Sequence, residues 1–224
     1  MRDQGPTRSS AIEVLGPAGA GKSTVISILC GHDPRFREGV AIAFSTKVLA
    51  LVRALASFVP AYLACYPHTR WFSREELARA VYLEGGLRAL QREDGAVILD
   101  HGPVFMLAML KAFGPELVAT KYFARWSRAI AGRWATALDT ILWLDAEDAL
   151  LIDRIEGRTR HHVVKGRPAD QACVFLGRCR AAFEEIVAEM SASHALRVLR
   201  ADTSTASAEE IAQWFRSSVD SPEH

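Results

Sequence analysis

The chain has 224 residues, of which 50% are hydrophobic and 24% are charged, and its formal net charge is +1. This length predicts one domain with a core large enough to fold alone, and the composition is that of an ordinary globular protein. The balanced charge gives no reason to expect nucleic acid or an anionic membrane as a partner. The first ten residues lack the apolar core of a signal peptide, and the four cysteines form neither a disulfide frame nor a zinc pattern. We therefore expect a cytoplasmic protein.

Residues 16–24, GPAGAGKST, fit the pattern G-x-x-x-x-G-K-[ST] at every fixed position. The largely apolar residues 12–15 before them predict a buried strand, and the largely apolar residues 25–29 after them predict a helix that Gly31 ends. In this context the pattern indicates a phosphate site, because glycines let successive N–H groups point inward and the helix N-terminus adds positive charge.

We expect this loop to hold ATP and Mg²⁺. Lys22 would reach the β- and γ-phosphates, and the Ser23 hydroxyl would be a ligand of the metal. The nucleotide-binding residues are then contiguous in the chain: Gly16, Pro17, Ala18, Gly19, Ala20, Gly21, Lys22, Ser23 and Thr24.

The segments that follow alternate between strand-like and helix-like patterns, which predicts a three-layer α/β fold around a mainly parallel sheet. The expected further strands are residues 39–43, 96–100, 140–144 and 196–199. The expected helices run from residue 46 to a break at Pro60, from a capping box at 73–76 to Gly95, over 115–138, from 145, over 170–191, and from a second capping box at 207–210. Ile211, Trp214 and Phe215 would face inward from the last helix. The uncharged stretch 54–67 is too short to span a bilayer.

Residues 96–100, AVILD, form the clearest strand after the first one, and this strand ends in an acid. In a parallel sheet its carboxyl end opens beside the phosphate loop, so we expect Asp100 to face the magnesium ion and the acceptor. The alternative is that Asp100 only caps the next helix.

Basic residues concentrate in a segment interrupted by Gly157 and Gly166: Arg154, Arg158, Arg160, His161, His162, Lys165 and Arg167. The residues after Gly157 show no helical periodicity, so we expect a mobile lid at about residues 154–168. Its arginines could fold over the phosphates, exclude water and neutralise charge as the phosphoryl group moves. The alternative is an ordinary solvated face.

The order of these motifs resembles the thymidylate kinase branch of the nucleoside monophosphate kinases. Four stretches carry the resemblance: residues 16–24, 97–102, 139–158 and 199–215. It implies a single P-loop kinase domain, residues 1–224, that moves the γ-phosphoryl group of ATP to a small-molecule acceptor. It also implies a set of catalytic residues, with Ser23 and Asp100 as the groups near the metal: Lys22, Asp100, Arg154, Arg158 and Arg160.

Two departures from the family pattern both fall on the acceptor side. His101 stands where the family has an arginine, and no counterpart of its monophosphate-contacting arginine lies between residues 36 and 70. We therefore expect an acceptor other than thymidylate, namely another nucleotide, a nucleoside or a different hydroxyl compound. The candidates for its binding wall are basic and aromatic residues, most of which core packing could equally claim: Arg53, Arg70, Trp71, Phe72, Arg79, Tyr82 and His101.

Two other functions stay open at this point. The chain could be a P-loop ATPase or nucleotide-binding regulatory protein without kinase activity, or a kinase relic that binds nucleotide without catalysis. The base-reading motif N-K-x-D of signalling GTPases is absent. Apart from the small-molecule acceptor we expect neither nucleic acid nor a membrane as partner, and a homodimer is left open. We expect residues 1–9 and 217–224 to be disordered or frayed tails.

Overall fold

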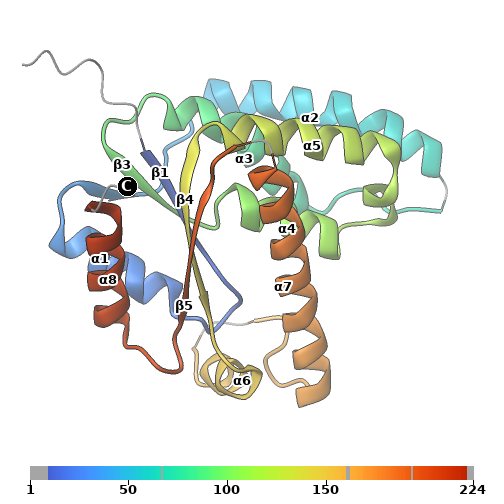
Figure 1. Ribbon diagram of the computed structural model, residues 1–224. Coiled ribbons are helices and arrows are strands. Elements are labelled where there is room, and N and C mark those ends of the chain that lie inside the picture. The colour runs from blue at the N-terminus through green and yellow to red at the C-terminus, as the bar shows by residue number, and fades with distance from the viewer. Residues whose placement is uncertain (1–9, 67, 160–161, 193, 221–224) are drawn as a thin grey trace, which may run out of the picture.

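The computed structural model describes residues 10–66, 68–159, 162–192 and 194–220. In this part of the chain a five-stranded parallel sheet has the strand order β2-β3-β1-β4-β5 (Figure 1). Its strands are β1 (Ser10–Leu15), β2 (Phe36–Glu38), β3 (Ala96–Asp100), β4 (Leu138–Asp145) and β5 (Arg197–Asp202). The predicted fold class, a three-layer α/β fold with a parallel sheet, is confirmed.

The first strand lies at the centre of the sheet, between β3 and β4. Its residues 11–15 are all buried, as expected for a strand covered on both faces. Val14 is paired with Asp100 of β3, and Leu15 with Trp143 of β4. The carboxyl ends of these three strands therefore meet at one edge of the sheet, the lower edge in Figure 1.

Helices cover both faces of the sheet (Figure 1). On one face α1 (Lys22–His32) packs against α8 (Ala208–Asp220), and on the other α4 (Pro103–Phe113) packs against α7 (Ala169–Ser191). The short α6 (Asp148–Glu156) lies beyond the carboxyl edge.

Three longer helices form an extension at the upper right of Figure 1: α2 (Phe44–Cys65), α3 (Arg74–Leu90) and α5 (Lys121–Ala135). Aromatic packing holds them together, with the ring of Phe58 4.6 Å from that of Phe72 and 4.7 Å from that of Trp126. The indole N–H of Trp134 donates to the Leu83 carbonyl at 2.9 Å. These side chains are continuous with the hydrophobic core on one face of the sheet, which includes Leu15 and Leu99.

The second strand lies earlier in the chain than predicted. It is Phe36–Glu38, whereas the prediction placed it at residues 39–43. Gly39 has a φ of +72°, a conformation that ends the extended run, and residues 39–43 follow without a regular strand.

Two helix predictions are also corrected. α2 continues through Pro60 to Cys65. Proline has no N–H group, so the carbonyl group of Ala56 loses its partner within the helix. The helix tolerates this loss because Ala56 and Pro60 both lie on its exposed side. The expected helix over 115–138 is divided into the 3₁₀ helix η1 (Glu116–Ala119) and α5, which the Thr120 hydroxyl caps by accepting from the Phe123 N–H at 3.3 Å.

At the end of the chain α8 continues to Asp220, so residues 217–220 are helical. Ile211 and Phe215 of α8 are buried as predicted, but Trp214 is 41% exposed. Both predicted capping boxes are present: Ser73 and Glu76 satisfy each other's backbone N–H groups, as do Ser207 and Glu210. The remaining predicted tail positions, 1–9 and 221–224, lie outside the described residues.

Among the described residues, α2 is the one helix long and apolar enough to cross a membrane by length and composition alone, and 22% of its most apolar 18-residue window is buried. Core helices of globular proteins also pass this test, but their windows are mostly buried. In α2, Ala50, Ala54, Phe58 and Ala61 are buried, and the helix packs against α3 and α5.

Candidate functional site

The glycine loop connects β1 to α1 at the centre of the carboxyl edge. Gly16, Gly19 and Gly21 have φ angles of +149°, +90° and +80°. A Cβ on Gly16 would lie 2.1 Å from the Leu144 carbonyl oxygen, and one on Gly19 would lie 2.7 Å from that of Leu151. Backbone conformation and close packing therefore both require glycine here, and the loop curls between strand and helix as predicted.

Lys22 is buried at the start of α1. Its Nζ donates to the carbonyl oxygens of Gly16 at 2.8 Å and Pro17 at 3.0 Å. Burial lowers the pKa of Lys22 to about 8, and the nearby negative charge of Asp100 offsets only part of this effect. In the described part of the chain the hydrogen-bond partners of this ammonium group are backbone carbonyl groups alone.

Asp100 ends β3 beside the loop, as predicted. Its Oδ1 atom is buried and has no hydrogen-bond partner among the described residues. The Nδ1 atom of His101 is 3.7 Å from it, and burial is the main cause of a lowered pKa of His101. A buried carboxylate oxygen needs a hydrogen-bond donor or a cation, and a water molecule bound to a metal ion could donate to it.

His101 itself has a φ of +58°, the one positive value among the described non-glycine residues. Its ring contacts the ring of Phe105, with 4.3 Å between the centroids. Strained backbone of this kind costs about 1 to 3 kcal/mol and occurs often at functional sites.

A first cavity, of about 500 Å³, opens on the α1–α8 side of the loop. Its walls are the loop itself, the start of α1, two arginines of the basic segment and the turn between β5 and α8. Arg154 connects these walls, because its guanidinium donates to the Thr203 Oγ1 and carbonyl oxygens, both at 2.8 Å, and to the Gly19 carbonyl oxygen at 3.3 Å.

A second cavity, of about 330 Å³, lies on the α4–α7 side of the same loop. Lys22, Ser23, Asp100 and His101 form its polar floor, and aromatic and sulfur-containing side chains of α4 and α7 form its walls. Those wall residues are Phe105, Met109, Phe175, Cys179 and Phe183.

Arg158 borders both cavities. It lies in the basic segment, two residues beyond the end of α6. His162 lines the second cavity from the same segment. Arg160 and His161 lie outside the described residues, so their predicted roles stay predictions.

The structure brings only one of the seven expected acceptor residues, His101, into the second cavity. Arg70 makes two hydrogen bonds to Glu76, at 2.7 and 2.8 Å, and Phe72 is buried against Phe58. Tyr82 stacks on Trp134 at 6.0 Å. The other three, Arg53, Trp71 and Arg79, also lie outside the lining.

Sequence reasoning missed the side chains that do line this cavity. None of its apolar wall residues was singled out as a site residue: Phe105, Met109, Phe175, Cys179 and Phe183. The turn residues 203–207 of the first cavity were not singled out as site residues either, although a turn after the last parallel strand must lie at the same edge as the loop.

Glu13 is a further buried group that sequence analysis did not identify. It lies on β1, and its carboxylate accepts from the backbone N–H groups of Val104 at 2.9 Å and Phe105 at 2.8 Å. Burial raises its pKa to about 8. Glu13 thus joins the central strand to the N-terminus of α4, which carries one wall of the second cavity.

Taken together, the parallel sheet, its strand order and the glycine loop after β1 define the fold of the P-loop nucleoside and nucleotide kinases. No family model matches this chain, and no curated protein sequence matches it.

Solved structures do match, at low identity. YorR from Bacillus subtilis, in complex with phosphorylated GDP, is 18% identical with a TM-score of 0.52, covering 94% of this chain and 95% of its own. Thymidylate kinase from Candida albicans is 14% identical with a TM-score of 0.51, covering 95% and 92%. Deoxyadenosine kinase from M. mycoides, with the products dCMP and dCDP, is 12% identical with a TM-score of 0.53, covering 94% and 98%. At these identities the likeness shows the fold.

Proposed function

We propose that this protein is an ATP-dependent phosphotransferase acting on a small-molecule acceptor. The observation that carries the proposal is the position of Arg158 between two cavities that share the glycine loop as a common wall. A kinase needs such an arrangement, because the transferring phosphoryl group must meet a donor site on one side and an acceptor site on the other.

The first cavity is the proposed donor site. Arg154 and the β5–α8 turn would hold the nucleoside end of ATP, and the loop N–H groups and Lys22 would hold its phosphates. The phosphates would take over the two hydrogen bonds that Lys22 now makes to carbonyl groups, since an anion is the stronger acceptor.

The residues at the loop also fit a magnesium ion. Ser23 is exposed at the start of α1, and Asp100 offers a buried oxygen without a donor. These two groups would hold the ion, whose contribution is to neutralise charge on the phosphates. Asp100 would also accept the proton of an acceptor hydroxyl.

The second cavity is the proposed acceptor site. Its walls present three phenylalanine rings, which suit a flat ring such as a nucleobase. Its charged groups are the cations Lys22 and Arg158 and the anion Asp100. Arg158 would neutralise the phosphoryl group during transfer, which places it in the role of an arginine finger.

The two arginines give a matched test. In Arg158→Ala we expect turnover to fall about 10³-fold with little change in ATP affinity, since the finger acts in the transition state. In Arg154→Ala we expect mainly weaker ATP binding, because this side chain is occupied with the donor wall. Turnover and ATP affinity are measured separately, by steady-state kinetics and by direct titration. An unchanged kcat in Arg158→Ala would remove it from the site.

A further inference from the structure

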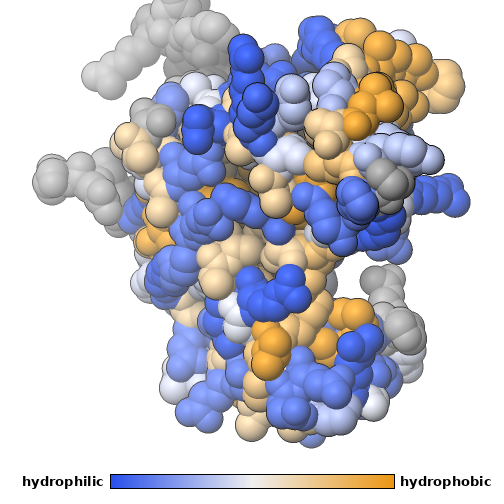
Figure 2. Space-filling model, turned by 90° about the vertical axis from the view of Figure 1, so that its right-hand side faces the viewer, coloured by the Kyte–Doolittle hydropathy of each residue, from blue (hydrophilic) through white to orange (hydrophobic). Residues whose placement is uncertain are grey.

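The walls of the second cavity come from two helices that pack against each other, α4 and α7. Phe105 of α4 lies beside Phe183 of α7, with 6.0 Å between the ring centroids. Between them the walls continue with Met109, which is 8% exposed, and Cys179, which is 4% exposed. Figure 2 faces the side of the molecule on which α7 runs, where hydrophobic side chains lie above and below a narrower middle part.

These wall side chains offer no strong hydrogen-bonding group. A phenylalanine ring has neither donor nor acceptor, and the thioether sulfur of Met109 is a weak acceptor. Burial raises the pKa of Cys179 to about 12, so this side chain stays a neutral thiol, which is a weak donor. The walls therefore contact a ligand through apolar surface and aromatic faces.

The backbone at the start of α4 has no N–H group left for a ligand either. The N–H groups of Val104 and Phe105 both donate to the Glu13 carboxylate, at 2.9 and 2.8 Å. The N–H group of Met106 donates to the Gly102 carbonyl oxygen at 3.0 Å. A free helix N-terminus would attract a phosphate group, but at α4 a carboxylate of the protein itself occupies that position.

The charged groups on the floor of the cavity already have partners in the proposed function. Lys22 would hold the ATP phosphates, Arg158 would neutralise the phosphoryl group during transfer, and Asp100 would repel a phosphate group on the acceptor. Arg79 of α3 lies outside the lining and is paired with Glu75 at 3.7 Å. The described lining therefore contains no further arginine or lysine for a phosphate group on the acceptor.

Two histidines also line the cavity. Burial lowers the pKa of His101, which favours its neutral form, and its ring lies against that of Phe105. The Nδ1 atom of His162 accepts from the Val164 N–H at 3.4 Å, and its ring lies 5.8 Å from that of Phe175. Both side chains thus add aromatic surface to the cavity.

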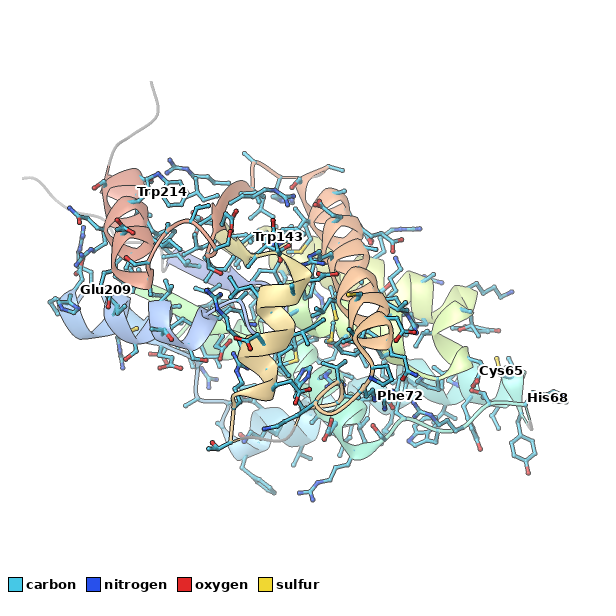
Figure 3. The ribbon with its side chains drawn as sticks, turned by 90° about the horizontal axis from the view of Figure 1, so that it is seen from below. Cys65, His68, Phe72, Trp143, Glu209 and Trp214 are labelled. Carbon is cyan, nitrogen blue, oxygen red and sulfur yellow. The ribbon has the colours of Figure 1, made fainter. Side chains whose placement is uncertain are left out.

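The hydroxyl groups of the first cavity lie on the other side of the glycine loop. They belong to the turn before α8: Thr203, Ser204, Thr205 and Ser207. Figure 3 shows the carboxyl edge from below, with Trp214 and Glu209 of α8 on one side and Phe72 on the opposite side. The linings of the two cavities share Arg158 alone, so a ring held between α4 and α7 does not meet these hydroxyl groups.

We propose that the acceptor is an uncharged alcohol whose flat ring is held between α4 and α7, and that the cavity recognises this ring by its shape without reading hydrogen-bonding groups on its edge. The inference rests on the proposed function. A nucleobase buried in this cavity would leave polar edge atoms without partners, which is costly. Rings with few polar groups on the edge are therefore the preferred class, and free nucleosides are better acceptors than their monophosphates.

The test compares three acceptors: thymidine, thymidylate, and the nucleoside in which 2,4-difluorotoluene replaces thymine. The last compound keeps the shape of the ring and loses the hydrogen bonds of its edge. We expect its kcat/KM to lie between one and about ten times that of thymidine, whereas a site that pairs with the edge rejects such an analogue by about 10⁴-fold. Thymidylate should react at least about tenfold more slowly than thymidine, because its charge has no partner.

A polar group added to the wall should create the edge reading that the parent lacks. In Met109→Gln we expect the ratio of the two nucleosides to shift at least about fivefold toward thymidine, because an amide can pair with the edge of the base. Cys179→Ser is a smaller change in the same wall and should shift the ratio in the same direction. The control is Met106→Gln, on the same helix but outside the lining, which should keep the ratio of the parent. Melting temperatures check that all three variants fold.

Three results would overturn the proposal. They are a preference for thymidine over the difluorotoluene nucleoside of about tenfold or more, a faster reaction of thymidylate than of thymidine, and ratios in Met109→Gln and Cys179→Ser that equal the ratio in Met106→Gln. The proposal also fails if neither nucleoside is phosphorylated while another acceptor increases ADP release, a result that leaves the proposed function intact. ADP release that no acceptor increases would instead contradict the proposed function itself.

Discussion

Lys22 makes both of its hydrogen bonds to carbonyl groups of its own loop, in a buried position that lowers its pKa to about 8. A bound triphosphate would raise that pKa again, because anionic oxygens stabilise the ammonium form. Binding ATP is then linked to proton uptake wherever the free lysine is neutral, which is above about pH 8.

This linkage predicts a loss of ATP affinity with rising pH. Between about pH 7 and about pH 9.5 we expect the Kd for ATP to rise roughly 30-fold, because about a thirtieth of Lys22 stays charged at the higher pH. In Lys22→Arg the affinity should be nearly independent of pH over this range, since a guanidinium stays charged. Titration of both proteins at the two pH values checks this. An equal rise in Kd for both would place the titrating group elsewhere.

At the residue scale, the sequence predicted groups that a fixed spacing defines. The loop pattern located Lys22 and its glycines, and the apolar strand before Asp100 located that acid at the same edge. The sequence could not identify Phe105 or Phe183 as site residues, because an aromatic residue that lines a cavity has the same periodicity as one that fills a core. Of the expected acceptor residues, His101 lines the second cavity and Phe72 packs against Phe58, as the alternative interpretation allowed. The roles expected of the others stay predictions.

At the scale of elements, α4 depends on one contact with the central strand. Glu13 holds the first N–H groups of α4, and Gly102 lies directly against its carboxyl group. A Cβ on Gly102 would lie 2.7 Å from Cδ of Glu13, in a space closed on all sides because Glu13 is fully buried.

We therefore expect Gly102→Ala to destabilise the fold by about 1 to 3 kcal/mol through overpacking, which lowers the melting temperature by roughly 2 to 12 °C in a chain of this size. The control is Gly132→Ala in α5, where an added Cβ meets nothing within 4 Å. That change should be neutral or stabilising, since alanine is the better helix former. Equal melting temperatures for Gly102→Ala and the parent would contradict the account of Glu13.

Element boundaries were predictable where a local signal fixes them. The capping boxes at Ser73 and Ser207 were predicted, because each uses two residues three positions apart. The position of β2 was not, since a three-residue edge strand carries too little pattern, and its register depends on β3. The continuation of α2 through Pro60 was missed because it depends on which side of the helix faces solvent.

At the scale of the whole molecule, the sheet places its central loop between two cavities, and Arg158 after α6 borders both. The alternation of strands and helices in the sequence was enough to predict the three-layer α/β fold and its parallel sheet. The outer face of α2 was beyond prediction, because which residues of an apolar helix stay exposed is decided only when α3 and α5 pack against it.

In the proposed function, the loop and Arg158 act together to transfer the γ-phosphoryl group of ATP to a small acceptor. The most direct test is ADP release from ATP and Mg²⁺, alone and with a panel of free nucleosides and nucleoside monophosphates. We expect negligible release without acceptor, acceptor-dependent release with at least one compound other than thymidylate, and none in Lys22→Ala. ADP release that no small acceptor increases, or that persists in Lys22→Ala, would contradict the account.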